Sequence, residues 1–248
     1  MRHLFLSAGT AWLILVSGNS ASASDAYVFE QVSRSTGGCV VTVNDSGIKV
    51  VSSSGSIIMA AAPSWDVYVL NDKVKKYSQT EFANFHGNFG LSQDFLSGSQ
   101  FSNVKFEEAS KPTVVFGLPA RTLTQKSEPG VPAMGPLDGR LRYDARARNL
   151  VYTVCDRISA DKHPGKLICQ YDHIPYKGSF PLELKFMDER GRAQIGLSTG
   201  NLRKVKISDT FFTVPREYKK VANQREIDLA SKDDLLKEML NGGGTPRR

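Results

Sequence analysis

Three sets of side chains in this sequence have the residue types that catalysis or metal binding needs. The first is Gly196-Leu197-Ser198-Thr199-Gly200, which matches the G-x-S-x-G pattern around the nucleophile of many hydrolases. That chemistry needs a strand–turn–helix context and a histidine base that follows the nucleophile in the chain. Here the flanking residues read as strand, turn and strand, and every histidine precedes Ser198. We therefore interpret the pattern as a coincidental hairpin turn.

The second set has the ligand types that zinc prefers. Cys155, His163, Cys169 and His173 alternate along one segment. Their separations do not match the close C-x-x-C pairs of structural zinc sites. The leader described below also indicates export to an oxidising compartment, where disulfides are favoured. We expect no metal ion here, with zinc as the less favoured alternative.

The third set is the carboxylates, which give no pair that we can place across a cleft. Asp188-Glu189 lies in a turn cluster, and Glu107-Glu108 points to both faces of one strand. The sequence also has no phosphate-binding glycine motif and no nucleotide fingerprint. We therefore predict no catalytic residue and no cofactor, so the protein is not expected to be an enzyme. The alternative, an enzyme, would need a cleft that brings His163 or His173 near a carboxylate or Cys39.

The cysteines instead suggest a disulfide and one remaining thiol. Cys155 and Cys169 lie in two runs that read as strands, Leu150–Asp156 and Lys166–Asp172. If these runs pair as a hairpin, the two sulfur atoms meet near its mouth, and we predict a Cys155–Cys169 disulfide. Closing that loop would stabilise the fold by about 3 kcal/mol in the chain-entropy model. We interpret Cys39 as a buried strand thiol.

The first 23 residues have the features of a secretory signal peptide. Arg2 forms a short basic region, Leu4–Val16 is mostly apolar, and Ala21-Ser22-Ala23 offers small residues for cleavage. This apolar run is short for a spanning helix, so a membrane anchor is the less favoured alternative. We expect a soluble periplasmic protein.

The formal net charge is +7, and the basic residues are scattered along the chain. A solvated surface is the favoured interpretation of this charge. Attraction to an anionic membrane surface or an acidic partner is the alternative. No nucleic-acid-binding motif is present, so we expect no nucleic-acid partner.

Alternating apolar residues predict the sheet that must position these side chains. The clearest stretch is Phe180–Val221, in which alternate positions are apolar: Phe180, Leu182, Leu184, Phe186, Ala193, Ile195, Leu197, Val205 and Ile207. Such alternation gives a strand one apolar and one polar face. Turn clusters at Asp188–Gly191 and Ser198–Asn201 predict a meander, and Pro215 ends it.

Short strands also fill most of the remaining chain. We predict strands at Tyr27–Arg34, Cys39–Val43, Ile48–Ser52, Ile57–Ala61, Trp65–Leu70, Lys73–Tyr77, Val104–Glu108, Thr113–Phe116, Ala120–Gln125 and Arg140–Ala145. Helices are predicted only at Thr80–Phe85 and Ser231–Asn241, and Ser127–Gly139 reads as an exposed loop.

Five phenylalanines follow the sixth strand: Phe82, Phe85, Phe89, Phe95 and Phe101. Glycine, serine, asparagine and glutamine separate them, so this stretch cannot be one regular strand. We consider an aromatic flap over an apolar cavity. The favoured alternative is a small core element packed on the sheet.

Short segments of the chain resemble the outer-membrane lipoprotein carrier superfamily. They are FEQVSR (29–34), GCVVTVNDSGIKV (38–50), DVYVLNDKVKKY (66–77) and FFTVPREYKKV (211–221). The resemblance implies a strongly curved antiparallel half-barrel whose concave apolar face is covered by helices and, in the carriers, holds acyl chains. The Arg-Pro dipeptide of the carriers would fall near Asn44-Asp45, so no functional arginine is transferred.

We therefore expect a mainly β protein with a strongly curved antiparallel sheet and a few short covering helices. Its predicted divisions are a signal peptide (1–23), the β domain (24–221), and a C-terminal helix with a disordered tail (222–248). The first hypothesis is a binding protein for a lipid or an acylated protein. The alternative is an extracytoplasmic sensor or protein-interaction module with a filled core. The residues expected to contact an apolar ligand are Phe29, Trp65, Tyr68, Phe82, Phe85, Leu182, Leu184 and Phe186.

Overall fold

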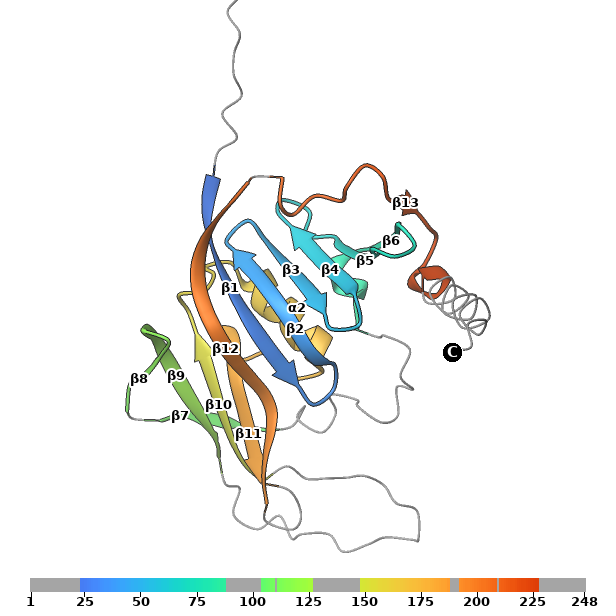
Figure 1. Cartoon of the computed structure of the whole chain (residues 1–248). Helices are drawn as coiled ribbons and strands as arrows, with labels where there is room; N and C mark the ends of the chain where they lie inside the picture. The colour runs from blue at the N-terminus through green and yellow to red at the C-terminus, as the bar shows by residue number, and fades with distance from the viewer. Residues whose placement is uncertain are drawn as a thin grey trace, which may run out of the picture.

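The protein is seen here in a computed structural model that describes residues 23–87, 104–109, 111–126, 148–187, 192–208 and 210–227. These residues form one large, open, curled sheet with little helix (Figure 1), which confirms the predicted mainly β class and curved sheet. No helix among them has the length and apolar character needed to cross a bilayer.

The strands are β1 (Ala23–Ser33), β2 (Gly37–Asn44), β3 (Gly47–Ser52), β4 (Ser56–Ala61), β5 (Val67–Asn71), β6 (Lys76–Thr80), β7 (Phe106–Glu108), β8 (Thr113–Val115), β9 (Leu118–Gln125), β10 (Arg148–Cys155), β11 (Phe180–Met187), β12 (Ala193–Ser208) and β13 (Lys219–Lys220). The helices described in full are the 3-10 helix η1 (Phe82–Asn84) and the α-helix α2 (Lys162–Asp172). Across the sheet the order is β13-β6-β5-β4-β3-β2-β1-β12-β11-β10-β9-β7, and β8 pairs with β9.

The first six strands form a meander, in which each strand pairs with the next. At the β2–β3 turn, Asn44 Oδ1 accepts hydrogen bonds from the backbone N–H groups of Ser46 (2.9 Å) and Gly47 (3.0 Å). Such a side-chain turn fixes the register of the two strands. Val43 therefore lies opposite Ile48, and both side chains are buried on one face.

The β5–β6 hairpin and the helix after it differ from the prediction in their boundaries. The turn follows Asn71, whose Oδ1 accepts a hydrogen bond from the Lys73 backbone N–H (3.0 Å), and β6 begins only at Lys76. The helix predicted from Thr80 is one 3-10 turn without a side-chain cap. The extra turn residues shift β6 three positions along the chain.

Strand β12 is one strand of 16 residues, so the turn predicted around Asn201 is wrong. The pairs Val28–Arg203 and Glu30–Gly200 show why, because β12 has one residue more than β1 between them. The turn-forming residues are accommodated in a β-bulge, where Asn201 takes a positive φ of 55°. Continuous pairing with β1 therefore prevails over the local turn signal.

The run 166–172, which was predicted as a strand, lies in α2. Asp161 caps this helix, since its Oδ1 accepts a hydrogen bond from the His163 backbone N–H (2.7 Å). Leu167 and Tyr171, four residues apart, then share one buried helical face. The helix ends at His173, which has a left-handed conformation. A short apolar run fits either period, and the cap at Asp161 decides for the helix.

The predicted Cys155–Cys169 disulfide is wrong, since all three cysteines of the chain are free. The helix places Cys169 against Tyr152, with 3.5 Å between sulfur and phenol oxygen. Cys155 instead donates a hydrogen bond to the carbonyl of Pro119 (3.3 Å). Cys39 is buried on β2, as predicted.

Other segments of the chain pack on both faces of the sheet. We call the face that α2 covers the inner face and the opposite face the outer face. Helix α2 packs on the inner face, behind β1 and β2 in the view of Figure 1. On the outer face, Phe212 and Tyr218 from the segment after β12 pack against Met59 and Leu70. Phe212 also packs closely against Gly47 of β3. A Cβ atom added at Gly47 would lie 2.5 Å from the Phe212 ring, so a larger residue would not fit there.

The same segment then continues into β13, which pairs in parallel with β6. The backbone N–H of Lys219 donates to the carbonyl of Lys75, and that of Val221 donates to the carbonyl of Tyr77, both at 2.8 Å. The two lysines of β13 are exposed. This short strand therefore covers the end of the meander.

Several predicted features lie outside the described residues. They are the leader through residue 22, the phenylalanines Phe89, Phe95 and Phe101, the loop Ser127–Gly139, the strand Arg140–Ala145 and the helix Ser231–Asn241.

Free cysteines predict the result of a thiol titration. We expect three reactive thiols per chain in denaturant without reductant, and very slow reaction in the folded protein. Burial raises the pKa of the Cys39 and Cys169 thiols to about 12, so little thiolate is present at neutral pH. A single reactive thiol in the denatured protein would contradict this prediction.

Candidate functional site

The inner face of the sheet is the first candidate site, because most of the predicted ligand residues lie on it. Phe29, Trp65, Phe85 and Leu182 belong to one buried cluster with residues of α2. The Phe29 ring packs edge-on against Phe180, with 5.6 Å between centroids. In the described residues this space is filled by the protein's own side chains.

The other predicted residues lie at three further places. Leu184 and Phe186 are buried in a neighbouring cluster with Tyr152. Phe82 is partly buried at the edge of the first cluster. Tyr68 lies on the outer face, among the residues that the segment after β12 covers. The structure therefore brings seven of the eight residues to the inner side and leaves Tyr68 on the opposite side.

The start of α2 is held by an aromatic contact to the β4–β5 connection. Trp65, which has a φ of 59°, stacks on His163 with 4.8 Å between centroids and 11° between planes. Phe82 packs edge-on against the same imidazole (4.9 Å), and His163 Nδ1 lies 2.7 Å from Asp161 Oδ1. These contacts occupy both the ring and Nδ1 of His163, so they fix the first turn of α2 on the sheet.

Two buried polar side chains connect the elements beneath α2. On β1, the Gln31 amide nitrogen donates to the Pro181 carbonyl and to Thr199 Oγ1, both at 3.0 Å. At the other end of α2, Asp172 accepts a hydrogen bond from Thr36 in the β1–β2 turn (2.5 Å). Burial raises the pKa of the Asp172 carboxyl to about 6.

Sequence reasoning missed Asp172 because it lies in the run that was interpreted as a strand. The signal was available in the helical period. In a helix, Asp172 follows Ile168 and Cys169 by four and three positions, so it shares their buried face. A lone carboxylate on a buried helical face is expected to have a raised pKa.

The outer face is the second candidate site, since part of it has no cover among the described residues. Val32 and Ile195 are each 56% exposed, and Val40 is 42% exposed. Val32 pairs with Ser198, and Val40 pairs with Glu30, so these side chains belong to adjoining strands. Exposed aliphatic side chains that gather on one face are typical of a contact surface.

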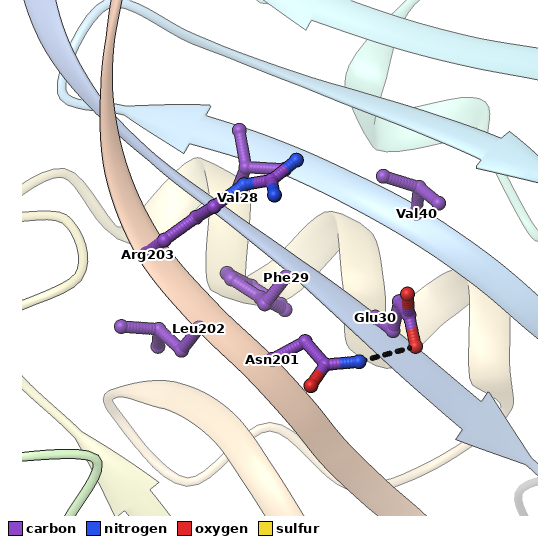
Figure 2. Close-up of a pocket in the computed structure, with 7 residues that line it drawn as sticks. All are labelled: Val28, Phe29, Glu30, Val40, Asn201, Leu202 and Arg203. Carbon is purple, nitrogen blue, oxygen red and sulfur yellow. Dashed lines mark hydrogen bonds between the residues drawn. The ribbon is translucent and has the colours of Figure 1, made fainter.

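A hollow of about 410 Å³ lies beside these valines, at the bulge of β12. It is lined by Val28, Phe29, Glu30, Val40, Asn201, Leu202 and Arg203 (Figure 2). Across it, the Asn201 side-chain amide donates to Glu30 Oε2 (2.9 Å). Arg203 forms no ion pair with a described residue. The lining of the hollow is therefore mixed, with apolar side chains beside an amide, a carboxylate and the guanidinium of Arg203.

The geometry for hydrolysis or metal binding is not found in the described residues. Ser198 lies inside β12, so the strand–turn–helix context of a hydrolase nucleophile is missing there. In the same part of the chain, no three His, Cys, Asp or Glu side chains lie close enough to hold a metal ion.

No protein-family model and no curated protein matches this sequence. Several solved structures are similar at low identity. One is PNGF-II, with a TM-score of 0.44 and 7% identity over 84% of this chain and 33% of that one. Another is a putative outer membrane lipoprotein-sorting protein domain from Vibrio parahaemolyticus, with a TM-score of 0.28 and 13% identity over 76% and 89%.

A third is the MucA/MucB complex of Pseudomonas aeruginosa, with a TM-score of 0.30 and 13% identity over 79% of this chain and 58% of that chain. The chain thus spans a third of the PNGF-II structure and just over half of the MucA/MucB chain. Likenesses this distant add nothing to the choice of function, which rests on the residues of this chain.

Two neighbours on β1 test whether the inner face is filled. Phe29→Ala should lower the free energy of unfolding by about 3–5 kcal/mol, because it leaves a cavity among buried side chains. Val32→Ala, three residues along the strand on the outer face, should cost less than about 1 kcal/mol. Urea denaturation of both variants measures this contrast, and equal effects would show that the two faces are not differently packed.

Proposed function

We propose that this protein is an exported interaction module that binds a protein partner through the outer face of β1, β2 and β12. The supporting observation is the pair of exposed aliphatic side chains Val32 and Val40, of which Val40 lines the hollow and Val32 lies two residues from Glu30 on β1. The inner face, where a ligand was expected, is filled in the described residues. The leader sequence in residues 1–23 supports export.

The chemistry of the hollow suggests what the partner presents. Val28, Val40 and Leu202 offer an apolar wall for one aliphatic side chain. The Glu30 carboxylate is engaged by Asn201, whereas Arg203 has its charge available. A partner with an aliphatic side chain next to a carboxylate would satisfy both groups, and the net charge of +7 also favours an acidic partner.

Photo-crosslinking followed by binding of the purified pair tests this function. A photoreactive amino acid at position 40 should crosslink to one protein in the cell of origin, and the same group at position 114 should not. Once purified, that protein should bind Val40→Lys about 10–100-fold more weakly. A lysine at this position cannot bury the apolar surface of the valine, which contributes about 1–3 kcal/mol to the binding free energy.

Val114→Lys is the matched control, since Val114 is 69% exposed on β8, away from the outer-face group. Its affinity should equal that of the unmodified chain. The proposal fails if both variants bind equally, or if the crosslinked partner is a second copy of this chain.

The second candidate function is binding of an apolar ligand, such as a lipid or an acylated partner, on the inner face. The observation that favours it is that, in the part of the chain that the structure describes, α2 packs on a broad apolar cluster of the sheet. Lifting α2 would expose Leu167, Ile168, Tyr171, Phe29 and Leu182, at a cost of about 8–15 kcal/mol. A sixteen-carbon chain would return about 12 kcal/mol, so the exchange is nearly balanced.

Lipid extraction and mass spectrometry of the purified protein test this second function. If it is correct, lipid is recovered, and a fluorescent fatty acid binds equally well to the unmodified chain and to Val40→Lys. That variant changes only the outer face, so it separates the two functions. Absence of both lipid and fatty-acid binding would rule out the inner-face function.

A further inference from the structure

The C-terminal end of α2 is fastened to the β1–β2 turn by a compact set of hydrogen bonds. Thr36 Oγ1 donates to Asp172 Oδ1 (2.5 Å), and Ser35 Oγ donates to the backbone carbonyl of Asp172 (2.8 Å). Ser33 Oγ lies 2.7 Å from Thr36 Oγ1 and orients it. Helix and turn are 136 residues apart in the chain, so these bonds join two distant segments.

The Asp172 carboxyl has little compensation for its burial. The residue is 3% exposed, and Oδ2 has no hydrogen-bond partner among the described residues. A buried carboxylate is costly unless a cation or several donors surround it. Burial is the main cause that raises the pKa of this carboxyl from 3.8 to about 6, and the Thr36 and Ser33 hydroxyls oppose it only in part.

Among the described residues, the titratable neighbours of Asp172 carry no charge that would hold it ionised. They are Cys39 on β2, Tyr152 on β10, and Cys169 and Tyr171 on α2, and burial raises the pKa of each. His173 follows it in the chain, and burial lowers the pKa of this imidazole. The nearest basic residue of the turn, Arg34, has its guanidinium over the Phe186 ring (5.9 Å).

We propose that Asp172 is a pH-dependent latch that holds the end of α2 on the β1–β2 turn when protonated and weakens when it ionises. The latch does not depend on which face of the sheet binds a partner. Releasing it frees the last turn of α2 and uncovers the adjoining part of the inner face.

The direction of the pH dependence follows from the proton that Asp172 takes up when the latch closes. In the open state the carboxyl is solvated and has its ordinary pKa of 3.8, whereas in the closed state burial raises its pKa to about 6. Closing therefore takes up a proton between these values. The closed state is most favoured below about pH 4, and its advantage falls as the pH rises through 6. The two pKa values differ by about two units, and each unit is a factor of ten in the equilibrium constant. The equilibrium constant for opening should therefore increase by about 100-fold in total between pH 4 and pH 7.5.

Hydrogen exchange of the whole chain, read by NMR between pH 4 and pH 7.5, measures this opening. Protection factors, corrected for intrinsic exchange, should fall by up to about 100-fold for the amides of the last turn of α2. Those of β3 should not change. The carboxyl carbon of Asp172 should titrate near pH 6 in the same sample.

Two variants separate the latch from a merely structural role. Asp172→Asn keeps the shape and removes the charge, so α2 protection should lose its pH dependence while the helix stays formed. Asp72→Asn changes an exposed carboxylate that pairs with Lys75 and should leave the α2 profile unaltered. An unchanged pH dependence in Asp172→Asn, or titration of Asp172 near pH 4, would overturn the proposal.

Discussion

The antiparallel ladder between β1 and β12 is the interaction on which the rest of the fold depends. It joins the meander at the start of the chain to the β9–β12 half of the sheet, and without it neither half completes a surface for α2. The ladder runs the length of β1, from Ala23–Ser208 to Ser33–Leu197. Gln31 reinforces it on the inner face, since its side-chain amide donates hydrogen bonds to Thr199 and to the Pro181 carbonyl. The two halves of the chain are thus joined by main-chain and side-chain bonds at the same place.

This ladder also explains why the two faces of the sheet differ. Continuous pairing across β12 requires a bulge, and the bulge lies beside the hollow of the outer face. On the inner face, the same strands carry large apolar side chains that α2 covers. At its start that helix is held by the contacts of His163 with Trp65 and Phe82, and at its end by the hydrogen bond from Thr36 to Asp172. The second of these contacts buries a carboxyl group.

The parts of the fold that the sequence predicts are those in which local and long-range forces agree. Strands β2, β3 and β4 have alternating apolar residues and strong turn signals such as Asn44, so their bounds match closely.

The predictions fail where local signals and long-range pairing disagree. Turn-forming residues around Asn201 lie within a strand because β1 pairs with both sides of them. The run around Cys169 is too short for its period to separate strand from helix, and that error also produced the disulfide and hid Asp172. The alternating apolar pattern predicts that the expected ligand-binding residues are buried. Whether a ligand or the protein's own side chains cover them on the inner face depends on where α2 packs, which the pattern does not give.

The short parallel strand β13 has a consequence for the solubility of the protein. A meander ends in an edge strand whose free N–H and C=O groups can pair with another chain. Here the backbone N–H groups of Lys219 and Val221 donate to the carbonyls of Lys75 and Tyr77, and the two-residue strand presents exposed lysine side chains. Charged side chains on a two-residue strand make a poor template for further pairing. The segment that packs on the outer face therefore also covers the start of this edge strand with a short, charged strand.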